Sequence, residues 1–529
     1  MPSSRKRGVA AWMSASLAGI LLCSVSTAAM AAPTSPSDAK LQAMQQQLDA
    51  MRAQLDALQA GGQANAQLNA MQQQLDAFGA QLAEMKTQAE TSNAAIATLQ
   101  LPPAANAVAT TLPNGRPTFA TTDGRFTANI RAILMMDAGK YFQDNNLPAT
   151  VTNRDLNDGI NFRRARIGFD GRLFSDFDYS FVYEFGGSGV EEAGRLYEAS
   201  VTYTALKPFR LKVGAFEPNI GLAAATSTSQ MPLLERPSPA EAARNVAAGD
   251  SRTAIQLSAN DAIGSETGIA VRWLASGAFT GNTLGGTQQF DEQTAWIGRV
   301  ALAPYSGVDW QAHFGGNIQH VYQPNDAVGP TGAGVRYPIQ IRDRPELRET
   351  GDRLIDTGAI DSDNATVYGA EAAIQIRNVL LEGELFRYEI ERRNSALPNP
   401  HFRGWYVQGS WVLTGETRIY NPIEGRFDAP RQSYSFNPAA GTWGMFELAA
   451  RYSTLDLNYR EGLDRAATPV GGIRGGEQKI LSLGANWYLN PSMRLMLDYQ
   501  HVDIDRLTAA GAQAGQEYDA IAARAQVTF

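Results

Sequence analysis

Arginines recur on one parity of a short segment, residues 162–173. Arg164, Arg166 and Arg172 share that parity, while apolar residues occupy most of the other. Because successive side chains of a β-strand point to opposite faces, a strand here places the three arginines on one face. A guanidinium group is always charged, and its planar fork matches the oxygens of a phosphate or carboxylate. We therefore expect a ladder of such groups to offer an anion successive weak binding sites, as conduction requires.

Basic residues on other expected strands have the same parity as this ladder. They are Arg131, Arg210, Lys212, Arg272 and Arg299. Arg163 has the opposite, apolar parity, so it is expected to face lipid near the rim of the sheet. The arginines on the ladder parity would line the interior of a closed sheet.

Carboxylates on the same face leave a second interpretation open. Asp137, Asp170, Glu184, Glu198 and Glu371 also have the inward parity. An arginine that pairs with one of them can brace the wall of a barrel without binding any solute. The sequence alone therefore leaves two roles open for each arginine, anion binding and bracing.

Composition argues against several other kinds of chemistry. The net charge of −8 argues against a broad basic surface for nucleic acid, so no nucleic-acid partner is expected. The residues that could hold a metal through sulfur or imidazole are few: Cys23, His313, His320, His401 and His501. We expect no disulfide, no metal centre and no cofactor. No nucleophile motif such as GxSxG accompanies the inward-facing His313, so we expect no enzymatic activity.

The N-terminal part of the chain differs from the rest. Residues 1–31 have the basic start, apolar stretch and small-residue cleavage pattern of a signal peptide, with cleavage after Ala31. Residues 32–101 contain apolar residues at alternating spacings of three and four, which predicts an α-helical coiled coil. A flexible amphipathic tether is the alternative. Residues 102–117 contain four prolines and predict an irregular linker.

From residue 118 to residue 529 the apolar period is two, which predicts β-strands. We predict sixteen strands, or about 26 residues for each strand with its connection, which is usual for an outer-membrane barrel. They centre on 124–138, 162–173, 177–185, 196–205, 209–217, 253–260, 267–275, 295–303, 308–320, 366–377, 379–390, 404–414, 444–453, 479–489, 493–504 and 518–529. The expected fold is all-β, a sixteen-stranded antiparallel transmembrane β-barrel preceded by the helical segment.

The connections support a barrel but contain one anomaly. Tight turns such as 490–491 alternate with long loops such as 218–252 and 321–365, as in membrane barrels. The stretch 415–443 is long where the count needs a short turn, so either the count slips there or the turn is elaborated. A soluble double-sheet protein would also alternate, with its apolar face as a core.

Several segments resemble the phosphate-selective porin O and P family, and together they span residues 120–529. They are RRARIGFDG at 163–171, TSTSQMPLLER at 226–236, GSWVLTGE at 409–416, ELAARYSTLDL at 447–457, LGANWYLNPSMRLMLDY at 483–499 and RAQVTF at 524–529. The last strand also ends on Phe529, as is typical of barrels assembled in the outer membrane.

The resemblance implies a Gram-negative outer-membrane porin for passive diffusion of small anions, phosphate or related anions among them. It also implies a homotrimer in contact with outer-membrane lipids, a periplasmic coiled coil, and a loop folded into the pore. The loop 218–252 is the candidate for that constriction and brings Arg236, Arg244 and Arg252 to the pathway. The expected anion pathway thus comprises Arg131, Arg164, Arg166, Arg172, Arg236, Arg244 and Arg252.

One departure from the family keeps other functions open. Glu217 precedes Pro218 where family members tend to carry a basic residue. A general, non-selective porin is one alternative. A cell-envelope tether or adhesive barrel is another, with the coiled coil contacting peptidoglycan or periplasmic partners.

Overall fold

The computed structural model describes residues 44–50, 52–53, 56, 65–98, 107–151, 153–186, 194–249, 251–264, 270–284, 291–307, 310–327, 335–394 and 396–529. The chain divides into two compact units, residues 1–103 and 104–529, and each is described by itself. The signal peptide predicted over residues 1–31 lies outside the described residues.

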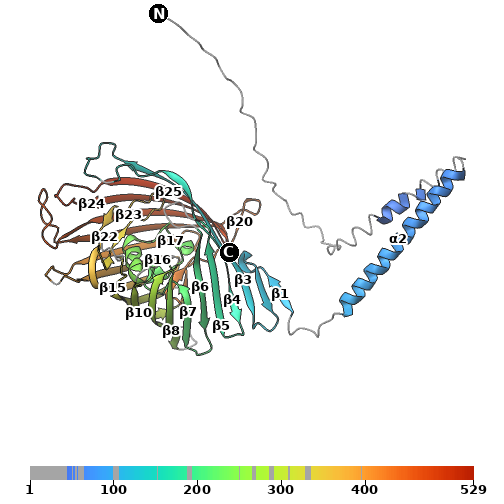
Figure 1. Ribbon diagram of the computed structural model, residues 1–529, viewed down its shortest axis with the longest axis horizontal. Coiled ribbons are helices and arrows are strands. Elements are labelled where there is room, and N and C mark those ends of the chain that lie inside the picture. The colour runs from blue at the N-terminus through green and yellow to red at the C-terminus, as the bar shows by residue number, and fades with distance from the viewer. Residues whose placement is uncertain are drawn as a thin grey trace, which may run out of the picture. The chain divides into compact units, whose positions relative to one another are not determined.

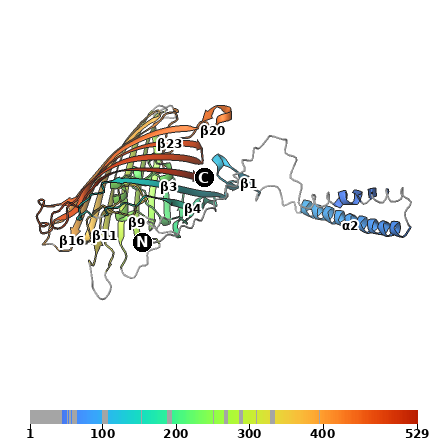
Figure 2. The same ribbon diagram turned by 90° about the horizontal axis from the view of Figure 1, so that it is seen from above.

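The second unit is a closed antiparallel barrel of sixteen strands (Figures 1 and 2). Each strand pairs with the next along the chain, and the last strand pairs with the first, from Tyr518 opposite Gln143 to Thr528 opposite Ile133. The strands are β3 (Thr127–Gln143), β4 (Gly159–Leu173), β5 (Phe177–Glu184), β6 (Arg195–Tyr203), β7 (Phe209–Phe216), β8 (Arg252–Gly264), β9 (Ala270–Thr283), β10 (Thr294–Ser306), β11 (Trp310–Gln323), β15 (Ile360–Ile376), β16 (Val379–Arg392), β17 (His401–Val412), β22 (Met445–Tyr459), β23 (Ile473–Asn490), β24 (Met493–Asp505) and β25 (Glu517–Thr528). All sixteen predicted strands are confirmed.

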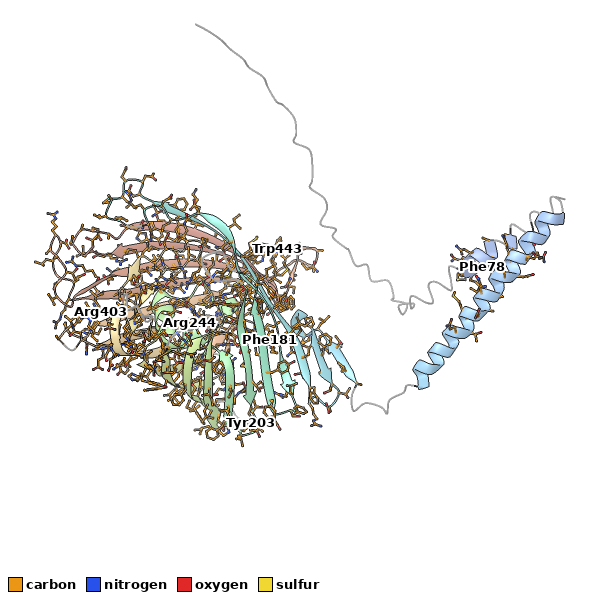
Figure 3. All side chains as sticks on the ribbon, in the orientation of Figure 1. Phe78, Phe181, Tyr203, Arg244, Arg403 and Trp443 are labelled. Carbon is orange, nitrogen blue, oxygen red and sulfur yellow. The ribbon has the colours of Figure 1, made fainter. Side chains whose placement is uncertain are left out.

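Side chains alternate between the two faces of the barrel wall. Phe169 and Phe181 lie opposite each other on β4 and β5 and are exposed on the outer face (Phe181 is labelled in Figure 3). Arg166 and Glu184, a directly opposed pair of the same strands, are buried inside. An apolar outer wall around a polar interior is the arrangement of a transmembrane β-barrel, because lipid can solvate only the apolar face.

The prediction that Arg163 faces lipid is wrong. The pairing of β3 with β4 steps at this point, since Met135 lies opposite Arg164 but Met136 lies opposite Phe162. This β-bulge inserts one extra residue and interrupts the strict alternation. Arg163 and Arg164 are consequently both buried in the barrel.

Three connections contain structure of their own. The β7–β8 connection contains α3 (Leu222–Ala225), η2 (Thr228–Gln230) and α4 (Ser238–Ala247), and the β11–β15 connection contains β12 (Pro338–Ile339), β13 (Arg342–Asp343) and β14 (Ile355–Asp356). The β17–β22 connection contains β18 (Ile419–Asn421), β19 (Arg426–Asp428), β20 (Phe436–Asn437), η3 (Pro438–Ala440) and β21 (Thr442–Trp443). The anomalous stretch 415–443 is therefore an elaborated turn, and the strand count does not slip.

The segment before the barrel is more regular than predicted. Within the expected linker 102–117, β1 (Val108–Thr111) and η1 (Pro113–Gly115) are ordered. β1 pairs with β2 (Thr118–Thr121), which pairs in turn with the start of β3. Backbone pairing thus extends the barrel sheet into a part of the chain that its prolines had indicated to be irregular.

The described part of the first unit is helical. The helix α2 (Asn65–Thr98) faces a helical stretch at 44–50, and Leu48 and Leu82 of the predicted apolar seam are both buried. The chain thus covers part of this seam with its own residues, while pairing with another chain as a coiled coil stays a prediction. Among the described residues, no helix is both long and apolar enough to cross a membrane.

Candidate functional site

The helix α4 closes one side of the barrel interior. Pro239 stands at the start of this helix, Glu241 lies in its first turn and Arg244 in its last. Proline fits the first turn of a helix, and charges in this order complement the helix dipole. The remaining positions are mostly alanine, which keeps the helix thin enough to fit between the barrel walls.

Aromatic side chains of the wall pack around α4. The hydroxyl of Tyr388 donates a hydrogen bond to the carbonyl of Pro239 at 2.6 Å. Phe402, Leu455 and Ala243 belong to the same buried apolar cluster. Figure 1 shows the helical segment of the β7–β8 connection inside the barrel, and Figure 3 labels Arg244 there. The described residues on this side of the interior form a packed apolar core.

A second inward loop fixes α4 in place. Glu346, from the β11–β15 connection, accepts hydrogen bonds from the backbone N–H of Ser238 at 3.1 Å and from the hydroxyl of Ser453 at 2.7 Å. It also forms a buried ion pair with Arg451 of the wall. Sequence reasoning missed this loop, because its charged residues look like those of any exposed loop.

The open space lies on the other side, along β3 to β7. One cavity of about 860 Å³ reaches the short-turn end of the barrel, where Pro491 and Phe529 line it. A smaller cavity of about 260 Å³ adjoins it. Both are lined by Arg131, Glu198, Ser227, Glu424 and Arg426. Because the two cavities share these residues, they adjoin each other, and the smaller one is called the narrow cavity below.

Basic side chains outnumber acidic ones around the narrow cavity. The basic residues are Arg131, Arg166, Lys212, Arg236 and Arg426, and the acidic residues are Glu198, Glu217 and Glu424. Three of the seven arginines predicted for the pathway, Arg131, Arg166 and Arg236, are therefore brought together.

The strands β3, β6 and β7 supply one ion-paired group of this cavity. Glu198 lies 3.0 Å from Lys212 and 3.9 Å from Arg131, so two cations share one carboxylate. Arg166 pairs with Glu184 at 2.6 Å and stacks on the ring of Tyr197, 3.3 Å from its centroid. The stacking leaves the guanidinium plane fixed at the cavity wall.

Arg236 is held differently, by carbonyl dipoles. Its guanidinium donates to the carbonyls of Ala223 and Thr226, at 3.0 Å each. No carboxylate in the described part of the chain lies within 4.0 Å of it. Arg236 thus has no directly paired carboxylate as Arg166 has, although its charge also acts on Glu241 of α4 and helps to lower the pKa of that residue. Because this compensation is indirect, Arg236 is the strongest candidate to attract an anion.

The other predicted arginines lie outside the narrow cavity. Arg164 lies 3.8 Å from Glu184. Arg172 pairs with Asp178 at 3.0 Å near the short-turn rim, where about half of its side chain (48%) is exposed.

The two remaining arginines of the β7–β8 region have partners as well. Arg244 pairs with Glu241 at 2.7 Å and with Glu217 at 3.1 Å. Arg252 donates to the carbonyl of Gly281 at 3.3 Å. For these four, geometry favours the bracing role that the sequence had left open.

A buried ion-pair network ties the β7–β8 connection to the wall. Glu235 receives a bidentate contact from Arg163, at 2.6 and 2.9 Å, and a further contact from Arg524 at 2.7 Å. Arg524 in turn binds Asp137 bidentately. Burial alone would raise the pKa of Glu235, but Arg163 and Arg524 outweigh it and hold that pKa well below its usual range. The network braces the wall with permanently charged partners.

The elaborated turn supplies site residues that the sequence did not indicate. Arg299 donates to the carbonyls of Glu424 at 2.8 Å and Gly425 at 2.7 Å, which fixes the tip of the β18–β19 hairpin inside the barrel. Arg426 of this hairpin pairs with Asp428 at 2.7 Å and lines both cavities. The only signal in the sequence was the unusual length of 415–443.

Comparisons with known proteins agree with this architecture. A model of the family described as "Phosphate-selective porin O and P" matches residues 136–529. Porin O of Pseudomonas aeruginosa is 25% identical over 411 residues, which cover 74% of this chain and 86% of that protein. An uncharacterized protein of Caulobacter vibrioides is 27% identical over 403 residues, 74% of this chain and 72% of that protein.

Solved structures of outer-membrane channels are also similar to the chain. The anion-selective porin from Comamonas acidovorans has 12% sequence identity and a TM-score of 0.42, over 76% of this chain and 100% of that one. The outer-membrane channel DcaP of Acinetobacter baumannii has 10% identity and a TM-score of 0.41, over 78% and 99% of the two chains.

Proposed function

Because the chain belongs to the phosphate-selective porin O and P family, we propose that it is an outer-membrane porin through which small anions diffuse passively. The observation that carries the anion preference is the narrow cavity, where five basic residues face three acidic ones. An anion about 4 Å from one guanidinium gains about 4 kcal/mol at an effective dielectric constant of 20. The carboxylates offset part of this gain, so the preference depends on Arg236, whose charge they do not pair.

We propose phosphate or a related oxyanion as the preferred solute, on the strength of the family and of the arginine forks. Glu217 bears on this choice because it lines the narrow cavity. Its carboxylate is occupied by Arg244 at 3.1 Å and by the hydroxyl of Tyr197 at 3.1 Å. These contacts reduce the repulsion that Glu217 would exert on an anion, without supplying the basic group usual in the family.

A general porin is the second candidate, and the same residue favours it. A carboxylate at the narrow cavity attracts cations and therefore weakens the selectivity of the pore for anions over cations. We also infer a homotrimer in the Gram-negative outer membrane, with the short turns and the helical unit on the periplasmic side, by analogy with the family. Contacts of the helical unit with peptidoglycan or periplasmic proteins stay a prediction.

Single-channel recording with added phosphate tests the proposal. If phosphate binds in the narrow cavity, it should reduce the chloride current of the purified protein in a concentration-dependent way. Chloride currents that phosphate leaves unchanged would favour the general porin. A protein that forms no channel at all would favour the tether.

A further inference from the structure

The elaborated turn between β17 and β22 contains two hairpins, one inside the barrel and one against its outer wall. The β18–β19 hairpin enters the barrel, where Arg299 holds its tip. The β20–β21 hairpin instead lies against the outer wall. Its Phe436 packs edge-on against Trp487, with ring centroids 5.3 Å apart. Figure 1 shows β20 projecting at the rim of the barrel near the C-terminus.

The contact residue Trp487 belongs to the outer face of the barrel. It lies opposite Phe446 on β22 and Leu495 on β24, and both of these side chains are exposed on the outer face. Trp487 also stacks on Phe446 with an interplanar angle of 9° and donates its indole N–H to the carbonyl of Trp443 at 2.7 Å. The hairpin is thus continuous with the apolar wall that faces lipid.

The composition of this hairpin is unusual for a turn in water. The eleven residues from Ser433 to Trp443 carry no charged side chain. Two large aromatic side chains are left uncovered, with Tyr434 70% exposed and Trp443 59% exposed. One carboxylate touches the hairpin at its start, where Glu416 accepts a hydrogen bond from the backbone N–H of Ser433 at 3.2 Å. Exposed aromatic residues with a polar atom are typical of the boundary between lipid headgroups and acyl chains.

We propose that the β20–β21 hairpin is a membrane anchor, seated in the headgroup region of the leaflet on the short-turn side of the barrel. Its occupant is the phospholipid interface, since the hairpin continues the lipid-facing wall and exposes aromatic rings at its edge. Tyr434 and Trp443 insert their rings among the upper acyl chains and keep their polar atoms among the headgroups.

A single fluorescent label at Tyr434 tests this anchor. In a Cys23→Ser background the chain has no other cysteine, so Tyr434→Cys can be labelled alone with the environment-sensitive dye NBD. The labelled full-length barrel is reconstituted in vesicles of phosphatidylethanolamine and phosphatidylglycerol, and heat-modifiable migration confirms that it is folded. Ala467→Cys, exposed in the long loop between β22 and β23, is the water-facing control, and Leu497→Cys on the outer wall is the lipid-facing control.

The expected result is blue-shifted emission from the label at 434, with several-fold stronger quenching by lipids that carry a nitroxide near the headgroup than at 467. Iodide should quench it less than at 467, and Trp443→Ala should reduce the lipid quenching. Iodide quenching equal to that at 467 would overturn the proposal. So would a label shielded from both iodide and nitroxide lipid, since the hairpin would then pack against another copy or another protein.

Discussion

Replacement of Arg236 by glutamine isolates the charge on which the anion preference depends. Carbonyls of Ala223 and Thr226 hold this guanidinium at 3.0 Å, and no described carboxylate lies within 4.0 Å. The substitution therefore removes a whole positive charge from the narrow cavity, while the carboxylates around it stay as they are.

The size of the effect follows from the distance to the passing anion. One unit charge contributes about 4 kcal/mol at 4 Å and about 1.7 kcal/mol at 10 Å, for an effective dielectric constant of 20. If the anion passes at the longer distance, removal of the Arg236 charge should lower the occupancy of the cavity by anions about tenfold, because about 1.4 kcal/mol corresponds to a factor of ten. Salt shortens the screening length from about 10 Å at 0.1 M to about 3 Å at 1 M, so the loss should shrink at high salt.

The assay is the zero-current potential of the reconstituted channel in a KCl gradient. Arg236→Gln should shift this potential toward cation preference, and more at 0.1 M than at 1 M. Arg236→Lys keeps the charge and should shift it little. Arg172→Gln removes the same charge at the rim, where Arg172 pairs with Asp178, and should also shift it little. Equal shifts for Arg236→Gln and Arg172→Gln would refute the reasoning, because the position of the charge would then not matter.

Four further predictions concern assembly, stability and the helical unit. Deletion of residues 520–529 removes most of the β25–β3 pairing and should abolish heat-modifiable, membrane-extracted protein; normal assembly would contradict closure by this strand. Arg163→Ala leaves Glu235 buried with fewer partners and should destabilise the barrel by about 3–5 kcal/mol in urea unfolding, whereas a value near zero would mean that the network does not brace the wall. Burial, helped by the nearby Asp137, raises the pKa of Glu349 in the β11–β15 connection to about 7. The pKa of Glu349 is higher in the folded than in the unfolded chain, so the folded loop is most stable at low pH, where Glu349 is protonated, and loses that stability as the pH rises to about 7. Protease cleavage of this loop should therefore increase over that range in the wild type but not in Glu349→Gln. Deletion of residues 32–101 should leave conductance unchanged, and a peptide of residues 38–101 should sediment as an oligomer. A monomeric peptide would contradict the predicted coiled coil between chains, and loss of conductance would contradict a dispensable helical unit.

The sequence predicted the barrel because the alternation of side chains is set by the backbone geometry of a single strand. The pattern can therefore be seen in each segment without knowledge of its partners. It could not predict where that geometry is interrupted. Arg163 has lipid-facing parity, but a bulge opposite Met135 and Met136 turns it inward to Glu235. Only the pairing of two strands reveals such a step.

The candidate site was predicted in part for a similar reason. Parity gives the face of a side chain but not its height along the barrel axis, so Arg166 and Arg172 looked alike although only Arg166 lines the narrow cavity. The tip of the β18–β19 hairpin contacts Arg299, which lies more than one hundred residues earlier in the chain, and no local pattern predicts such a contact. The length of 415–443 indicated an elaborated turn or a miscounted strand, but it did not indicate that Arg426 lines the cavities.

The sign of the zero-current potential of the wild-type channel tests the central claim most directly. With KCl more concentrated on one side of the bilayer, a pore in which Arg236 has no directly paired carboxylate should let chloride carry more current than potassium. The potential should then have the sign of an anion-selective channel, and its magnitude should grow as the salt concentration falls. A potential with the sign of potassium selectivity would contradict the account and leave the arginines of the barrel as braces of its wall.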